Sequence, residues 1–365
     1  MPTVKELTRY LETIAPLAYQ ESYDNSGLLV GEPNAKITKA LISLECTEAV
    51  VQEAISTGCN LVISHHPLIF KGLKKLTGSN EVERTVMLAL RNNIALYAIH
   101  TNLDSVLHGV SRRMAEKLGL QNLKILDQKL ETLTKLVTFT PINHTETVLS
   151  ALHAAGAGNI GEYSNCSFRV QGKGRFTPSA SASPAIGERG KPEEVTEDRI
   201  EVIFPTHLKE QVIDGLRAAH PYEEVAYYLT TLQNANQEVG LGMIGELPEP
   251  VSEEDFLQAI KKSFNLKVVR HTPLLGRKVQ RVAVCGGAGS FLTRKAIAKK
   301  ADFYITADVK YHEFFDAGNR LVLADIGHYE SEIATTELLR QILSEKFTTF
   351  AVNLTTITTN PILYT

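Results

Sequence analysis

Two spacings of apolar residues follow one another near the start of the chain. Residues 40–46 form a short apolar run, residues 48–57 place apolar side chains every three or four positions, and residues 61–64 are apolar again. Short apolar runs are typical of buried strands, whereas the wider spacing predicts an amphipathic helix. Thr47 is a suitable N-cap for this helix and Gly58 a suitable end. The pattern therefore predicts a strand–helix–strand unit whose parallel strands are covered by helices.

The same order of elements returns near the C-terminus. Strands and helices alternate between residues 281 and 325, before a helix that begins near His328. We interpret residues 39–104 and 280–332 as diverged copies of one supersecondary pattern, because polar clusters follow equivalent strands in both. The outer part of the chain is therefore expected to be one α/β domain built from two related halves.

Between the two copies the pattern changes to β-α-β-β-α-β. Strands are predicted at 136–142, around 166–170 and 174–178, at 199–205 and at 225–233, with helices at 145–155 and 208–219. With the two short neighbouring strands counted as one, this order is that of the ferredoxin-like fold, so we expect an inserted α+β domain at 130–233 that divides the outer domain into residues 1–129 and 234–365. The serine-, alanine- and proline-rich segment 179–194 has little apolar surface to bury and is expected to be a mobile loop.

Composition and charge restrict the classes of function. The chain has 365 residues, of which 43% are hydrophobic and 22% charged, which suits a globular protein of two or three domains. The formal net charge of -3 gives no overall attraction for nucleic acid or anionic lipid. No run of about 18 apolar residues occurs. We therefore expect neither a membrane nor a nucleic acid as a partner.

The cysteines and the N-terminal segment indicate a cytoplasmic protein. The four cysteines are far apart and form no C-x-x-C pair, so neither a thiolate zinc site nor a disulfide framework is expected. Residues 1–16 have the spacing of an amphipathic helix and lack the apolar segment of a signal peptide. A reducing, cytoplasmic compartment is the expected location.

His65 and His66 form an adjacent pair at the end of a predicted strand. They follow the apolar run 61–64 and precede Pro67, which ends the strand. Adjacent side chains of a strand point to opposite faces, so one metal ion rarely binds both histidines, whereas two neighbouring ions can share them. Considered alone, such a pair is more often two histidines with ordinary hydrogen bonds. The metal interpretation depends on further ligands nearby.

Histidine and carboxylate residues recur at two further strand ends. His100 and Asp104 follow the next strand, and His328 and Glu332 lie one helical turn apart near the C-terminus. Imidazole nitrogen with carboxylate oxygen is a ligand set suited to zinc, iron or manganese, and a carboxylate can bridge two ions. The pattern therefore predicts two divalent metal ions per chain.

Other polar residues near these strand ends are weaker ligand candidates. Asp24, Asp308 and His312 are more often turn residues or partners that orient a ligating histidine. His100, Asp308 and His312 are also candidates for a role beside the ions in catalysis. No catalytic residue is assigned from the sequence.

Five motifs in this order resemble the NIF-three-like family of dinuclear-metal proteins, whose members are often named GTP cyclohydrolase 1 type 2 homologues. The motifs are YDNSGLLVG (23–31), SHHPLIF (64–70), HTNLD (100–104), TADVKYHE (306–313) and GHYESE (327–332). The resemblance covers nearly the whole chain. It implies that the metal ligands are His65, His66, Asp104, His328 and Glu332, with Glu332 as the bridge.

The surroundings of the site depart from the family pattern at two positions. Ala307 and Tyr23 stand where the family usually has glycine and tryptophan, so the walls of the site are expected to differ. GGAGS (286–290) follows a strand and opens a helix. A tight turn is favoured there over a phosphate cradle, because G-x-G-x-x-G spacing and a P-loop lysine are absent.

The inserted region resembles the middle domain of longer bacterial members, which is similar to PII-like and CutA-like trimeric ferredoxin folds. The resemblance rests on GNIGEYSNCSF (158–168) and HPYEE (220–224), which spacing alone assigns to a glycine-rich turn and a proline-terminated helix end. It implies that this domain binds a small effector or supports trimer formation. Family members are similar to toroidal hexamers, so a homohexamer is expected.

Two functions follow from the resemblance and the ligand set. In the first, the ions activate water for hydrolysis of a small, nucleotide-like substrate, as the GTP cyclohydrolase name implies. In the second, the protein is a non-enzymatic metal-binding regulator or scaffold with an effector-sensing inserted domain. The same ligands serve both functions, so the sequence leaves open whether the protein is an enzyme. An open coordination position would favour the enzyme.

Overall fold

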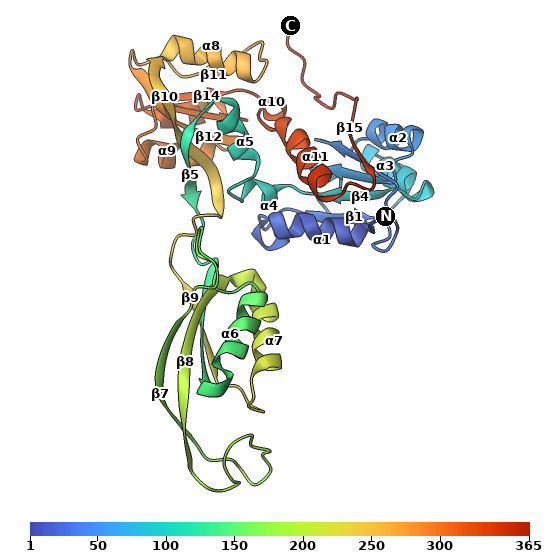
Figure 1. Cartoon of the computed structure of the whole chain (residues 1–365). Coiled ribbons are helices and arrows are strands. Elements are labelled where there is room, and N and C mark those ends of the chain that lie inside the picture. The colour runs from blue at the N-terminus through green and yellow to red at the C-terminus, as the bar shows by residue number, and fades with distance from the viewer. The chain divides into compact units, whose positions relative to one another are not determined.

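The computed structural model describes residues 1–365 and divides into two compact units. The first unit comprises Met1–Asp127 and Val239–Thr365, and the second comprises Gln128–Glu238. Two of the three sheets belong to the first unit and one to the second (Figure 1). No helix combines the length and the apolar character needed to cross a membrane. The expectation of a mixed α/β fold with several sheets is confirmed.

One sheet of the first unit has the strand order β1-β4-β3-β2-β15. Its elements are β1 (Gly27–Val30), β2 (Lys39–Ser43), β3 (Leu61–Ser64), β4 (Ala95–Ala98), β15 (Ala351–Leu354), α1 (Val4–Ile14), α2 (Glu48–Thr57), α3 (Glu81–Arg91), α4 (Thr101–Asp104) and α11 (Ala334–Lys346). β2, β3, β4 and β15 run parallel, and β1 is antiparallel to β4 at one edge. α1 and α11 pack on one face, and α2 and α3 pack on the other.

Alternating side chains explain this packing. In β2, Ala40 and Ile42 belong to the core beneath α1 and α11, whereas Leu41 belongs to the core beneath α2 and α3. Because both faces are covered, β3 and β4 are buried along their whole length and have continuous apolar sequences. α1 begins with a capping box, in which Thr3 Oγ1 accepts from Glu6 N and the Glu6 carboxylate accepts from Thr3 N.

The second sheet of this unit repeats the central arrangement of the first, with the order β11-β14-β13-β12-β10-β5. Its elements are β5 (Gln121–Gln128), β10 (Gly240–Ser252), β11 (Arg270–His271), β12 (Lys278–Ala288), β13 (Phe303–Ala307), β14 (Val322–Asp325), α5 (Val110–Lys117), α8 (Glu253–Ser263), α9 (Thr293–Ala298), α10 (His328–Glu332) and the 3-10 helices η4 (Ser290–Leu292) and η5 (Tyr311–Ala317). β12, β13 and β14 are parallel and adjacent, as β2, β3 and β4 are. α5 and α8 contribute to the core of one face and α9 to that of the other.

The second unit is one antiparallel sheet with two helices on a single face. Its sheet has the order β7-β8-β6-β9. Its elements are β6 (Leu133–Pro141), β7 (Phe168–Phe176), β8 (Glu193–Pro205), β9 (Tyr227–Leu232), α6 (Thr145–Ala154) and α7 (Lys209–Ala219). α6 and α7 lie side by side over a core that includes Leu136, Ile200 and Phe204 (Figure 1). The opposite face of the sheet carries no helix, and β7 and β8 form a long hairpin.

Part of this unit differs from the expectation. The short strands expected around 166–170 and 174–178 are one continuous strand, β7, because Gly172 pairs with Glu197 of β8 and does not interrupt the ladder. The segment between β7 and β8 contains turns but no helix or strand. Its mobility, and the independence of the domain expected at 130–233, stay predictions.

Candidate metal centre

His65 and His66 are placed by the end of β3. Their backbone N–H groups continue the parallel ladder, donating to Ser43 O at 3.2 Å and to Leu44 O at 3.0 Å. Pro67 has no N–H to donate and ends the ladder. Both histidines are buried. The pair therefore lies at the carboxyl edge of the sheet, where ligands of parallel sheets are usually bound.

Two short helices bring the remaining ligand candidates to this region. α4 follows β4 and carries Asp104 one turn after His100, and α10 follows β14 and carries Glu332 one turn after His328. Gly327 has φ of 91°, a left-handed conformation that lets the chain turn from β14 into α10. Each half of the unit thus supplies a histidine and a carboxylate four residues apart, directly after the third of its adjacent parallel strands.

Side chains from both halves converge on the carboxylate of Glu332. Glu332 Oε2 lies 3.0 Å from the Nε2 atoms of His66 and His328 and 3.9 Å from Nε2 of His65. Asp104 Oδ1 lies 3.7 Å from Nε2 of His65. Three groups have ligand atoms within 4.8 Å of one another: His65 with Asp104 and Glu332, His66 with His328 and Glu332, and His65 with His66 and His100. This buried cluster could bind metal ions.

The Nδ1 atom of each histidine in the cluster is held by an oxygen atom. The partners are Ile99 O for His65 (2.8 Å), Glu45 Oε1 for His66 (2.5 Å), Asp308 Oδ2 for His328 (2.7 Å) and Asp24 Oδ1 for His100 (2.8 Å). Carbonyl and carboxylate oxygens accept hydrogen bonds, so these contacts place a proton on Nδ1. Nε2 is then left as the atom that can bind a metal ion.

The centre of the cluster leaves three buried polar atoms without a well-aligned hydrogen bond. They are His65 Nε2, Asp104 Oδ1 and Glu332 Oε2. Buried acceptors without a donor are energetically costly, and buried carboxylates more so. Divalent cations would compensate all three atoms at once. The nitrogen and oxygen donors present therefore fit zinc, iron or manganese.

The pKa values of the cluster also favour the binding of cations. Burial lowers the pKa of His65 to about 3, so this imidazole is neutral. Burial opposes protonation of His66 and His328 too, but close contacts with the Glu332 carboxylate raise the pKa of His66 to about 10 and that of His328 to about 9. Against the effect of burial, those contacts hold the pKa of Glu332 well below its usual range. Burial and the charge of Glu332 raise the pKa of Asp104. Bound cations would take the place of these protons.

The cluster opens into a cavity of about 680 Å³. Besides the ligand candidates, its lining includes Tyr23, Phe70 and Phe291, which are 69%, 50% and 63% exposed. Exposed aromatic rings beside a polar centre provide a flat apolar surface for a ligand. The cavity therefore suits a small molecule with a planar group. Ala307, the other departure from the family pattern, is buried in β13 and does not line it.

The GGAGS segment after β12 forms part of the wall. Gly287 has φ of 62°, and a Cβ atom at this position would lie 2.3 Å from Glu332 Oε1. Gly287 N donates to Ser331 Oγ at 3.0 Å, which ties the segment to α10. Glycine is required here because the backbone packs directly on the carboxylate.

The weaker candidates from the sequence separate into two groups. Asp24 and Asp308 each accept from Nδ1 of a histidine of the cluster, as described above. His312 is exposed in η5, where its ring contacts Tyr311 and Phe315, and it does not line the cavity. A direct role beside the ions is therefore better supported for His100 and Asp308 than for His312.

Glu45 takes part in the cluster although the sequence analysis does not identify it. Its carboxylate accepts from His66 Nδ1 at 2.5 Å and lines the cavity. The one available signal is its position just beyond β2, at the same edge of the sheet as the histidines.

The chain is similar along almost its whole length to one protein family. The family model Duf34/NIF3 (NGG1p interacting factor 3) matches residues 2–361. A GTP cyclohydrolase 1 type 2 homolog of Halalkalibacterium halodurans is 38% identical over 340 residues, which cover 92% of this chain and 91% of the relative. The protein of that name from Bacillus subtilis is 36% identical over 342 residues, covering 93% and 92%. A crystal structure of a Bacillus cereus protein related to NIF3 has a TM-score of 0.86 and 37% identity, covering 100% of this chain and 99% of that one.

Proposed function

The chain belongs to the Duf34/NIF3 family, and on this premise we propose that it binds two divalent metal ions and uses them to hydrolyse a small, nucleotide-like substrate. The observation that carries the proposal is the position of Glu332 Oε2, close to Nε2 atoms of three histidines from both halves of the unit. The names of the relatives, GTP cyclohydrolase 1 type 2 homolog, suggest the substrate class.

The three groups of ligand atoms suggest how the ions would be shared. One ion would be held by His65, Asp104 and Glu332, and the other by His66, His328 and Glu332. Glu332 belongs to both groups and would be the bridge. His65 and His66 would then serve different ions, as expected for adjacent residues with oppositely directed side chains. When bound, two such ions supply Lewis-acid activation of water and of a substrate oxygen.

Other residues of the chain would orient the ligands and the substrate. Although burial opposes it, hydrogen bonds from His100 and Thr101 hold the pKa of Asp24 well below its usual range. Asp24 is therefore a carboxylate that fixes the His100 ring, whose other edge lines the cavity. Tyr23 and Phe70 would contact the planar part of a substrate, and their apolar surface would exclude water.

We also propose that the second unit is a ferredoxin-like, PII-like inserted domain. The proposal is supported by its chain order β6-α6-β7-β8-α7-β9, its antiparallel sheet and its two helices on one face. Homohexamer formation and a cytoplasmic location stay proposals that rest on the family resemblance and on the sequence.

A non-enzymatic regulator is the second candidate function. It is favoured by one observation, a cavity in the second unit that is separate from the metal centre. In this case the metal ions would be structural or carried, and the second unit would sense a small molecule.

Metal analysis combined with an activity screen tests the first function against the second. Protein stripped with a chelator and reloaded with zinc, manganese or iron is expected to hold two ions per chain. His65→Ala and His66→Ala should each lose chiefly one ion, whereas His312→Ala should keep both. Hydrolysis of a nucleotide, a cyclic ureide or a phosphodiester should disappear with chelator and return with metal. Less than about half an ion per chain after reloading contradicts the site, and fully loaded protein without activity favours the regulator.

A further inference from the structure

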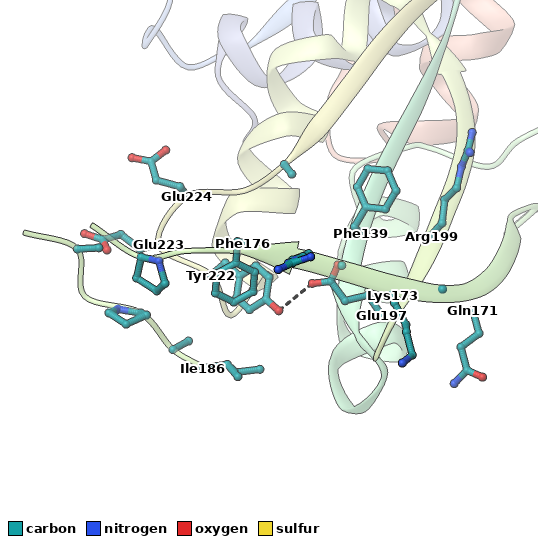
Figure 2. Close-up of a pocket in the computed structure, with 18 of the residues that line it drawn as sticks. Phe139, Gln171, Lys173, Phe176, Ile186, Glu197, Arg199, Tyr222, Glu223 and Glu224 are labelled. Carbon is teal, nitrogen blue, oxygen red and sulfur yellow. Dashed lines mark hydrogen bonds between the residues drawn. The ribbon is translucent and has the colours of Figure 1, made fainter. Parts of the chain in front are cut away.

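A second cavity lies wholly within the unit Gln128–Glu238. Its volume is about 580 Å³, a size typical of small-molecule sites. Its floor is the face of the sheet opposite to α6 and α7, and its rim is formed by the segment between β7 and β8 and by the HPYEE segment, 220–224 (Figure 2). The metal centre does not use this cavity, and of the two functions proposed above only the regulator would give it a role, without naming what it binds.

A buried carboxylate lies in the floor. Glu197 of β8 is 7% exposed, and a Cβ atom at Gly174 of β7 would lie 2.0 Å from Glu197 Oε2. Glycine at this position is therefore what lets the carboxylate lie across β7. Glu197 Oε1 accepts from the Tyr222 hydroxyl at 2.8 Å, whereas Oε2 has no donor in the protein (Figure 2). Burial and this hydrogen bond raise the pKa of Tyr222, so its hydroxyl remains a donor.

The HPYEE segment fixes these groups in place. His220 Nδ1 accepts from Tyr222 N at 3.1 Å, so the proton of this imidazole lies on Nε2, which donates to Phe139 O at 2.9 Å. Glu223 Oε2 accepts from Ser183 N at 2.8 Å. The segment is thus fastened both to β6 in the floor and to the loop that forms the rim. This is a specific role for a motif that spacing alone assigns to a helix end.

Aromatic rings flank the carboxylate. Phe176 and Tyr222 pack edge to face with ring centroids 5.8 Å apart, and Phe139 and Tyr228 do the same at 5.8 Å. Phe139 lies diagonally across from Glu197 on the neighbouring strand β6. In Figure 2, Glu197 lies between Tyr222 and Phe139. A flat molecule could therefore contact apolar rings while its polar edge meets the carboxylate.

Two of the three cations that line the cavity are paired with other carboxylates. Lys173 Nζ lies 2.6 Å from Glu194, and an Arg199 nitrogen lies 2.8 Å from Glu201. Lys173 and, to a smaller extent, Arg175 lower the pKa of Glu194, which is exposed and lies on the other face of the hairpin. With these two cations paired, the cavity presents the Glu197 carboxylate as an acceptor for N–H donors of a ligand.

We propose that this cavity binds a planar small molecule that presents two adjacent N–H donors to Glu197. Amidine and guanidine groups and the donor edge of a guanine base share this chemistry. One donor would reach Oε2, and the other would reach the second lone pair of Oε1, which Tyr222 leaves free. The aromatic rings would contact the flat body of the ligand. This binding is independent of the metal centre.

Binding of two probes to the full-length protein tests the proposal. Benzamidine carries a cationic amidine, and guanosine carries the neutral donor edge. Benzamide and adenosine are comparators of similar shape that lack N–H donors on two neighbouring nitrogen atoms. In calorimetric titrations we expect saturable binding of benzamidine, guanosine or both, at least about tenfold tighter than that of the comparator. Benzamidine alone would identify a cationic ligand, and guanosine alone a neutral base.

Substitutions place the bound probe at Glu197. Glu197→Gln keeps the size of the side chain but replaces an acceptor oxygen by a donor, and it should weaken binding at least about tenfold. Gly174→Ala should weaken it as well, because the new methyl group displaces Oε2. Glu194→Gln is the matched control, since it removes the same charge from the other face of the hairpin, and it should leave affinity within about twofold. Metal content and the melting temperature verify that each variant is folded.

Three results would overturn the proposal. One is the absence of saturable binding of both probes, and another is binding that Glu197→Gln leaves unchanged. The third is a change in the size of the assembly by light scattering in Glu197→Gln, with no probe bound by the unsubstituted protein. That result would mean that a second copy of the chain, and not a small molecule, covers this face.

Discussion

Glu332 is the carboxylate on which histidines from both halves of the unit converge, because its Oε2 is close to three imidazole nitrogens. Glu332→Gln keeps the shape but removes the negative charge that both ions would share. We expect this variant to lose both ions in elemental analysis after reloading and desalting. His100→Ala should lose less, with affinity reduced about 10–100-fold, as is typical of a group that orients ligands.

The neighbouring Glu330→Gln is a suitable control for that experiment, because Glu330 lies in the same helix but accepts from Asn360 at 3.2 Å and does not line the cavity. It should keep both ions. Equal losses from Glu332→Gln and His100→Ala would show that the assignment of ligands is wrong.

Protons and metal ions compete for His66 and His328. In the metal-free protein their pKa values are raised to about 10 and about 9, so both imidazoles are protonated at neutral pH. An ion needs the neutral imidazole, so binding should release protons at neutral pH and tighten as the pH rises, and the release should vanish above about pH 10. Calorimetry in buffers of different ionisation enthalpy measures the number of protons released per ion bound. Binding without proton release at neutral pH would contradict the structure of the centre.

The ligand candidates could be identified from the sequence because each pair sits at a strand end with a recognisable spacing. His328 and Glu332 share a helix face. The side chains of His65 and His66, which are adjacent in a strand, point to opposite faces. Glu45 has no such spacing, and its role depends on where the His66 ring turns. Protonation states are also beyond the sequence, since they follow from burial and from contacts between residues distant in the chain.

At the scale of the elements, the repeat gives both halves of the metal centre the same construction. α4 and α10 each follow the third of three adjacent parallel strands, and an aspartate holds the histidine of each helix. Alternation of apolar and polar segments was sufficient to predict these strands. It was not sufficient for β7, where it predicted two short strands, because the backbone pairing of residues 171–173 with β8 does not need apolar side chains.

Gly287 tests whether the turn after β12 positions Glu332. Gly287→Ala would place a methyl group 2.3 Å from Glu332 Oε1 and strain a backbone with φ of 62°. We expect a loss of metal together with a loss of about 1 kcal/mol or more in the free energy of unfolding. The measurements are elemental analysis and denaturant titration.

Gly276→Ala is the control that separates the effect of backbone strain from the effect of displacing the Glu332 side chain. Gly276 has a similar φ of 69°, but a Cβ atom there would have no neighbour within 4 Å. This variant should lose stability to a similar extent and keep its metal. If both variants retain metal equally, the turn does not position Glu332.

At the scale of the whole molecule, the two units have separate apolar cores. The core of the second unit contains residues of that unit alone, and the cores of both sheets in the first unit contain none of them. Separate cores allow each unit to fold without the other. The change from α/β to β-α-β-β-α-β order is the sequence signal from which a separate domain at 130–233 is predicted. The cavity on the open sheet face was not visible, because Glu197, Tyr222 and Phe139 come from different strands and a turn.

Removal of residues 130–233 tests that independence. The two chain crossings are neighbours, since β5 and β10 are adjacent strands and Asn236 N donates to Lys129 O at 3.2 Å. A short Asn-Gly turn could therefore replace the segment without stretching either strand. The shortened protein should remain soluble, melt cooperatively and hold two ions per chain, and it should no longer bind benzamidine or guanosine. Aggregation or loss of metal would show that the first unit depends on the second, and retained probe binding would place the probe site elsewhere in the chain.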